Sequence, residues 1–327
     1  MQIAIADAHS LLTQVMAKLG HAEADIPAIV NHLIDCELRG LGYGGLARAV
    51  AITERIGRTG MPTRPIEVTH ETPVSAKVHG HDHIGYIVGQ RATDIAIEKA
   101  KTYGLSAVGL VDTWYTGMLS YFAEQAAADD LVTMIASNAA PWVAPHGAAE
   151  GRFGTNPICF GFPAEPHPII WDIGTSNIMH AEVLLARRLG EKLPEGRAIG
   201  PDGQPTTDPN AALKGAFTAW GGHKGSGLGL MVQLLGVLAG SDGITDDMGG
   251  FGMTIVAMKT NLFGDGEATK RRIIDYAEAV RGAKPLDPAS PVRMPFDRSY
   301  QVREAARAKG SFDANDQIVE KLKAFLG

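Results

Sequence analysis

The sequence predicts an α/β protein whose two ends join to form a helical cap. Short apolar runs alternate with segments of helical periodicity through the middle of the chain, which is typical of strands and helices that share one core. Helical segments without intervening strands stand before and after that region. The 327 residues, 45% of them apolar and 20% charged, are enough to bury a large core.

The first elements are expected to be helices. Apolar residues recur at helical spacing over 25–38, and the glycines within 40–45 end this helix. Residues 39–48 are therefore expected to lie at the C-terminal end of a helix.

The middle of the chain predicts strands and helices in turn. Candidate strands are the apolar runs at 106–111, 131–137, 157–162, 169–173 and 253–258. Candidate helices lie around 95–97 and over 117–128, 178–189, 228–238 and 267–281. A Gly/Pro/Asp-rich stretch at 195–210 indicates a long loop of the kind that often serves function or contacts a partner.

The C-terminal part returns to helices. A Pro-rich connection at 284–295 leads to helical segments near 299–309 and 313–326. We expect residues 1–74 and 286–327 to pack together as the cap, and 75–285 to form the α/β domain.

Charge and composition exclude several classes of protein. The net charge is −6, and no run of Lys or Arg follows one face as a nucleic-acid phosphate backbone would require. No apolar run approaches the roughly 18–20 residues that cross a bilayer, and the N-terminus has no secretion signal, so we expect a cytoplasmic protein without a membrane partner. Cys36 and Cys159 are expected to be buried free thiols.

A glycine-rich turn at 221–227 is a candidate anion site. The Gly225–Gly229 run does not complete a dinucleotide fingerprint, because the sixth position is Leu230. A glycine turn before a helix presents free amide groups to a phosphate, with Lys224 beside them. A tight packing turn explains the same residues.

The run His-Gly-His-Asp-His at 79–83 could hold a metal, since alternate residues of a strand face the same side. No fourth ligand is evident, and the neighbouring glycines favour a mobile turn. We therefore assign no metal.

Several blocks carry a resemblance to one family. The run at 37–48, Glu-Leu-Arg-Gly-Leu-Gly-Tyr-Gly-Gly-Leu-Ala-Arg, resembles the N-terminal active-site block of the malate/L-lactate/sulfolactate dehydrogenase family. Further blocks follow in the family's order and spacing at 112–117, 154–157, 171–176, 202–209 and 222–225. Relatives include 2,3-diketogulonate reductase, ureidoglycolate dehydrogenase and the reductases of cyclic piperideine and pyrroline carboxylates. The resemblance covers nearly the whole chain.

The resemblance implies a fold and a set of site residues. Family members have a non-Rossmann NAD(P)-binding domain with a mixed sheet and are typically homodimers that bind NAD(H) or NADP(H) near the subunit interface. Arg48 matches the arginine that holds the substrate, and a guanidinium suits a carboxylate. The implied cofactor positions are Asp172, Ile173, Gly174, Thr175, Ser176, His223, Lys224, Phe296, Asp297 and Arg298.

The family's proton-donating residues are replaced. Where the family places a Ser-His pair, this chain has Tyr43 and Gly44, and the second family histidine is Tyr115. Reducing a ketone produces an alkoxide, whose protonation by a positioned acid contributes about 10²- to 10⁴-fold in rate. Tyr115 or Tyr43 is therefore the candidate acid.

Three functions fit these replacements. Reduction of a protonated imine yields a neutral amine and needs no such acid, so a C=N substrate tolerates the loss. A 2-oxo or 2-hydroxy acid substrate would use Tyr115 or Tyr43, or both tyrosines could form an aromatic pocket with Trp114. A third possibility is a cofactor-binding homologue without turnover that acts as a binding or regulatory protein.

Overall fold

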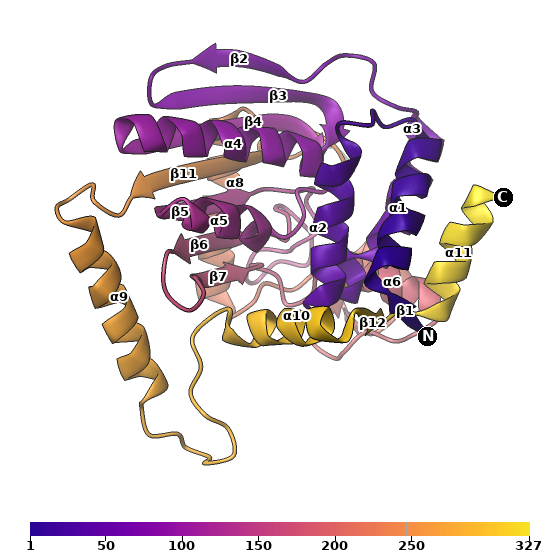
Figure 1. Cartoon of the computed structure of the whole chain (residues 1–327). Helices are drawn as coiled ribbons and strands as arrows, with labels where there is room; N and C mark the ends of the chain where they lie inside the picture. Colours follow the sequence, from indigo (N-terminus) through magenta and orange to yellow (C-terminus); the bar gives the residue numbers. More distant parts are fainter. Residues whose placement is uncertain (246–247) are drawn as a thin grey trace.

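Three parts make up the molecule in the computed structural model, which describes residues 1–245 and 248–327 (Figure 1). A seven-stranded sheet with helices on both faces forms the centre, helices from both chain ends form a cap, and a small three-stranded sheet lies beside them. The α/β class and the cap built from the two termini are confirmed.

The main sheet is mixed. Its order is β2-β3-β4-β11-β5-β6-β7, and only the β3–β4 pair is parallel. The strands are Glu67–Glu71 (β2), Ser75–Ile84 (β3), Leu105–Trp114 (β4), Leu131–Ser137 (β5), Ile158–Phe162 (β6), Ile169–Ile173 (β7) and Phe251–Lys259 (β11). The five predicted strands are all present. β2 joins this sheet although it falls within the range 1–74 that we assigned to the cap.

Helices cover both faces of the sheet. α4 (Gly85–Tyr103) and α5 (Leu119–Ala128) lie on the face nearer the viewer in Figure 1, and α8 (His223–Ala239) lies behind it. A Cβ at Gly89 of α4 would lie 2.8 Å from the Phe122 ring of α5, so the two helices pack closely. The core between α4, α5 and the sheet is apolar and buried, and a smaller apolar cluster around Val232 lies under α8.

The cap joins the two ends of the chain. Its helices are α1 (Ile5–Leu19), α2 (Ile26–Leu38), α3 (Leu46–Thr59), α10 (Asp297–Lys309) and α11 (Asp316–Leu326). β1 (Gln2–Ala4) pairs with β12 (Ser311–Asp313). Residues of both ends share one apolar core, which continues to Trp114 and Tyr115 at the end of β4. The cap therefore packs directly on the strand end that bears a candidate acid.

A buried cluster of charges ties the cap to the sheet domain. Arg39, at the end of α2, contacts Asp35 at 2.6 Å and Glu124 of α5 at 2.5 Å. Arg303 of α10 contacts the same two carboxylates at 3.2 and 2.5 Å. Three helices distant in sequence thus meet through mutually satisfied charges.

The small sheet corrects the predicted loop at 195–210. β8 (Ala198–Ile199) and β9 (Pro205–Thr206) fall inside that range and pair with each other, and β8 also pairs with β10 (Ala216–Phe217). α6 (His180–Leu189) and α7 (Pro209–Lys214) belong to this part. Strands of two residues carry too little periodicity to be predicted.

Two other predictions of local structure were wrong. α8 begins at His223, not near residue 228, so most of the predicted glycine turn is helical. Residues 79–83 lie within β3 and do not form a mobile turn.

The prediction of buried free thiols at Cys36 and Cys159 is confirmed. In the two described ranges, no helix is long and apolar enough to span a membrane.

Candidate active site

A cavity of about 370 Å³ lies where the cap, the main sheet and the start of α6 meet. Its wall includes the segment between α2 and α3, the turn after β4 and the starts of α6 and α10. The predicted site residues in this wall are Tyr43, Arg48, Tyr115, Asp172, Gly174, Phe296 and Arg298. The other predicted residues lie elsewhere in the described chain and are Ile173, Thr175, Ser176, His223, Lys224 and Asp297.

The glycine-rich segment after α2 is shaped by Glu37. This buried carboxylate accepts the Leu46 amide N–H at 2.6 Å and so satisfies a free donor in the first turn of α3. A Cβ at Gly45 would lie 2.3 Å from the Glu37 side chain, so the close approach requires glycine. Burial raises the pKa of Glu37 to about 7. The arrangement fixes Tyr43 before α3 and Arg48 in its first turn.

Arg48 and Tyr115 are brought together from distant parts of the sequence. The Arg48 guanidinium lies over the Tyr115 ring, 3.9 Å from its centroid. Arg48 is half-buried, and within the described ranges no carboxylate lies at ion-pair distance from it. Its charge is therefore available to an anion in the cavity.

The turn that carries Tyr115 is tightly constrained. Tyr115 adopts a left-handed conformation, with φ of 51°, directly after β4. A Cβ at Gly117 would lie 2.4 Å from the Tyr86 ring. The Met118 amide donates to His32 Nε2 at 2.8 Å, and burial lowers the pKa of His32 to about 3, so the neutral ring can accept this bond. The Tyr115 ring is placed by this turn and by Arg48.

Two further phenols line the cavity. Tyr43 comes from the segment between α2 and α3, and Tyr86, fully buried, comes from the first turn of α4. Burial raises the pKa of both phenols well above the usual range, while the Arg48 charge acts in the opposite direction. Both remain protonated at neutral pH and can donate hydrogen bonds. Sequence analysis missed Tyr86, because a tyrosine in a helical segment carries no distinguishing signal.

His180 is a histidine of the cavity wall that sequence analysis also missed. It stands at the start of α6, where its ring stacks on Trp142 with centroids 3.9 Å apart and planes 7° apart. Burial, reinforced by the nearby Arg48 charge, lowers the pKa of His180 to about 3. The imidazole is therefore neutral. The only sequence signal was its position shortly after the block at 171–176.

Comparison with known proteins identifies the family of the chain. The sequence profile described as malate/L-lactate dehydrogenase matches residues 3–323. The chain belongs to the malate/L-lactate dehydrogenase family. Malate/(S)-sulfolactate dehydrogenase of Methanothermus fervidus is 30% identical over 99% of this chain and 96% of that protein. Delta(1)-pyrroline-2-carboxylate reductase of Ancylobacter novellus is 32% identical over 95% and 93% of the two chains.

A solved structure extends the comparison to the whole fold. A dehydrogenase from Sinorhizobium meliloti superposes with a TM-score of 0.91, at 30% identity, over 100% of this chain and 98% of that one. As a member of the malate/L-lactate dehydrogenase family, the protein is an oxidoreductase of the dehydrogenase and reductase type. The alternative of a homologue without turnover gains no support from these relatives.

The block at 172–176 has two kinds of residue in this family member. Asp172 Oδ2 accepts the Ser120 amide at 2.7 Å at the start of α5, and burial raises the pKa of Asp172. Gly174 lines the cavity next to it. Thr175 is buried and donates to backbone carbonyls, and Ser176 donates to the Thr218 carbonyl. Ile173 packs at the end of β7. The block shapes the wall more than it exposes polar groups.

The remaining predicted cofactor residues divide in the same way. Phe296 and Arg298 line the cavity, and Arg298 is also exposed to solvent. Asp297 is buried and holds Arg281 through two hydrogen bonds of 3.0 and 2.8 Å, which makes it part of the α10 start. His223 and Lys224 are exposed in the first turn of α8, away from the cavity wall.

Proposed function

We propose that the protein is an NAD(P)H-dependent reductase that transfers hydride to a small carboxylate-bearing substrate, with Arg48 holding the carboxylate. The observation that carries the proposal is the half-buried guanidinium in the cavity wall, stacked on Tyr115 and without an acidic partner among the described residues. A carboxylate can pair with it through two parallel hydrogen bonds.

The reacting carbon of such a substrate is next to its carboxylate, and therefore lies close to Tyr115 when Arg48 holds the acid group. The nicotinamide cofactor supplies the hydride. Tyr43 and Tyr86 keep their protons and can orient the substrate by donating hydrogen bonds. Trp142 and His180 close one side of the cavity with stacked flat faces and limit the access of water.

We propose a cyclic C=N bond as the main substrate group. The cavity wall combines aromatic faces with a neutral imidazole, and aromatic faces favour a protonated imine. Hydride addition to that iminium gives an amine without further proton transfer, so the absence of the family's usual histidines is tolerated. The relative named delta(1)-pyrroline-2-carboxylate reductase supports this choice.

A C=O substrate is the second candidate, favoured by Tyr115 itself. Its ring lies in the cavity wall beside the Arg48 cation. In this reaction Tyr115 would donate its phenolic proton to the oxygen that gains the electron pair. The relative named malate/(S)-sulfolactate dehydrogenase supports this candidate.

The test is a panel of substrates with NADH and NADPH, in which turnover is measured as the loss of absorbance of the reduced nicotinamide. Pyrroline-2-carboxylate and piperideine-2-carboxylate represent C=N acids, and pyruvate, oxaloacetate and sulfopyruvate represent C=O acids. We expect the highest kcat/KM with a cyclic imine acid. Higher kcat/KM with every oxo acid would reverse the order of the two candidates, and cofactor binding without any turnover would contradict both.

The proposed cofactor is NAD(H) or NADP(H). Flat aromatic residues in the cavity wall, Trp142 and Phe296 among them, suit a nicotinamide ring, and the exposed Arg298 guanidinium suits a phosphate group. Asp172 and Gly174 would border the same ligand. For His223 and Lys224 a contact with the cofactor stays a prediction. Fluorescence titration with each reduced cofactor measures which of them binds more tightly.

We further propose a homodimer whose interface includes α8 and α9 (Gly266–Arg281). One face of α8 exposes an apolar stripe consisting of Leu230, Met231, Leu234, Val237 and Leu238. α9 projects from the body in Figure 1 and buries only Ala277 within the chain. Apolar surface of this extent is typical of a protein interface. Leu234→Glu should give monomers in sedimentation analysis, whereas Tyr103→Glu, an equally exposed site on α4, should not.

We also propose that 75–285 supplies most of the cofactor site, with Phe296 and Arg298 added from 286–327, while 1–74 and 286–327 form the cap and contribute to dimerisation. A cytoplasmic location is proposed with it, since reduced nicotinamide cofactors are supplied there. Cell fractionation would test that location.

A further inference from the structure

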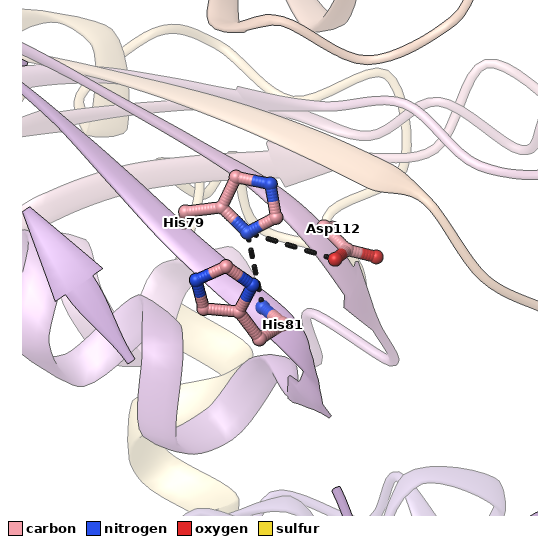
Figure 2. Close-up of side chains that lie close together, drawn as sticks. All are labelled: His79, His81 and Asp112. Carbon is pink, nitrogen blue, oxygen red and sulfur yellow. Dashed lines mark hydrogen bonds and ion pairs between the residues drawn. The ribbon is translucent and has the colours of Figure 1, made fainter. Parts of the chain in front are cut away.

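We propose that His79, His81 and Asp112 form a binding site for one divalent transition-metal ion of the zinc class, outside the cavity described above. Figure 2 shows the three side chains converging at neighbouring points of β3 and β4. One potential ligand atom from each lies within 4.8 Å of the others. Two imidazoles and a carboxylate are a ligand set that suits zinc, nickel and copper.

The backbone brings these residues together in an unusual way. The β3–β4 register shifts between His79 and His83, so that β3 bulges at this point. His81 and Asp112 adopt left-handed conformations, with φ of 47° and 59°. A Cβ at Gly80 would lie 2.6 Å from the Asp112 carbonyl oxygen, so only glycine permits the approach.

The bulge decides which histidines can share an ion. Regular alternation would have placed three imidazoles on one face, but His83 turns away and bonds the Arg64 carbonyl at 2.9 Å. Asp112 takes the third place. In the proposed site Asp112 therefore stands where the alternation of the sequence alone would place His83.

The spacing of the polar atoms suits a bound cation. The His81 amide N–H points at His79 Nδ1 at 3.2 Å, which makes that nitrogen an acceptor. The same nitrogen faces Asp112 Oδ2 at 3.6 Å, and a carboxylate oxygen is also an acceptor. An imidazole nitrogen has a single lone pair, so an ion placed between His79 Nδ1 and Asp112 Oδ2 would take that lone pair from the His81 amide N–H. Zinc bonds of about 2.0–2.2 Å place tetrahedral ligands about 3.3–3.6 Å apart, close to this spacing.

Glu67 contacts the second ring nitrogen of His81. Its Oε2 lies 3.3 Å from His81 Nε2, so it can accept that N–H and leave His81 Nδ1 free for a metal. A carboxylate that orients a ligating histidine through its second nitrogen is common in metal sites. The rings of His79 and His81 also stack, with centroids 4.0 Å apart, which holds both in place. An ion here would join β3 to β4 three residues before Tyr115.

The test uses the full-length protein with any affinity tag removed and metals stripped by a chelator. Calorimetric titration with Zn²⁺ should show one ion per chain. His79→Gln, His81→Gln and Asp112→Asn should each weaken binding at least about 100-fold, and Glu67→Gln about 10- to 100-fold. His83→Gln is the matched control on the same strand and should bind as the wild type does.

A second measurement tests the site without any variant, so misfolding of a variant cannot affect it. The wild-type protein with Co²⁺ should develop visible absorption bands of a four-coordinate site, and one equivalent of Zn²⁺ should abolish them. Absence of stoichiometric Zn²⁺ binding by the wild type overturns the proposal. So does equal weakening in His83→Gln and His79→Gln, since that result would indicate diffuse surface binding. Circular dichroism confirms the fold of each variant.

Discussion

Arg48 is the residue on which substrate selection is expected to depend. Arg48→Gln removes a charged hydrogen-bonding partner, so KM for a carboxylate substrate should rise roughly 10- to 150-fold. Arg58→Gln, an exposed arginine at the end of the same helix, should leave KM unchanged. The comparison substrate is 1-pyrroline, which has no carboxylate. An equal loss on that substrate would mean that Arg48 supports packing and does not bind the acid group.

Tyr115 separates the two candidate reactions. Tyr115→Phe keeps the ring under the Arg48 guanidinium but removes the hydroxyl. Reduction of oxo acids should fall about 10²- to 10⁴-fold, since their alkoxide needs a proton, whereas reduction of a cyclic iminium should change less than about threefold. Steady-state kinetics on both substrates gives the answer, and a parallel loss on both would refute a proton-donor role.

Glu37 should make stability depend on pH. Its pKa is raised to about 7 in the folded protein, above the ordinary value of 4.5. The folded state therefore binds this proton more tightly than the unfolded state does. The contribution of Glu37 to the free energy of unfolding falls as pH rises from about 4.5 to about 7, by up to about 3 kcal/mol. Glu37→Gln should remove that slope. Urea unfolding of both proteins between pH 4.5 and 8 measures it, and superimposable pH profiles would disprove the assignment.

Residues of the site differed in how far the sequence could predict them. Arg48 and Tyr115 stand in recognisable blocks, so their place in one cavity could be expected from the resemblance. His180 and Tyr86 could not be found, because the stacking of His180 on Trp142 and the burial of Tyr86 exist only after the chain has folded. Asp297 was predicted to bind the cofactor, but it holds Arg281. The sequence does not show this contact, since Arg281 belongs to a different helix.

At the scale of elements, the charge cluster between α2, α5 and α10 is expected to hold the cap in place. Glu124→Gln would leave Arg39 and Arg303 with Asp35 as their only carboxylate in the cluster. Loss of one partner from a largely buried set should lower the free energy of unfolding by about 2–4 kcal/mol. Glu320→Gln breaks only the exposed pair with Lys323 and should cost less than about 0.5 kcal/mol. Equal effects in denaturant titrations would show that the cluster adds nothing.

The elements were predictable where their periodicity is long. The strands at the centre of the sheet and the helices of the cap bury enough apolar residues to give a clear pattern. The start of α8 was misplaced because its first turn contains glycines, which indicate a turn when viewed locally but here permit contact with the Trp220 backbone. β8 and β9 are fixed by pairing with each other, a contact that no local pattern records.

At the scale of the whole molecule, the cavity is built jointly by the cap, the main sheet and helix α6, so a ligand there should stabilise all three together. At 100 times its Kd, a ligand that binds only the folded state adds about 2.7 kcal/mol, which should raise Tm by a few degrees. Arg298→Gln should reduce the shift caused by NADPH or NADH but not that caused by pyrrole-2-carboxylate, and Arg48→Gln should do the reverse. Differential scanning calorimetry gives both shifts. If the two variants lose the same shifts, the assignment of the Arg298 end to the cofactor and the Arg48 end to the substrate is wrong.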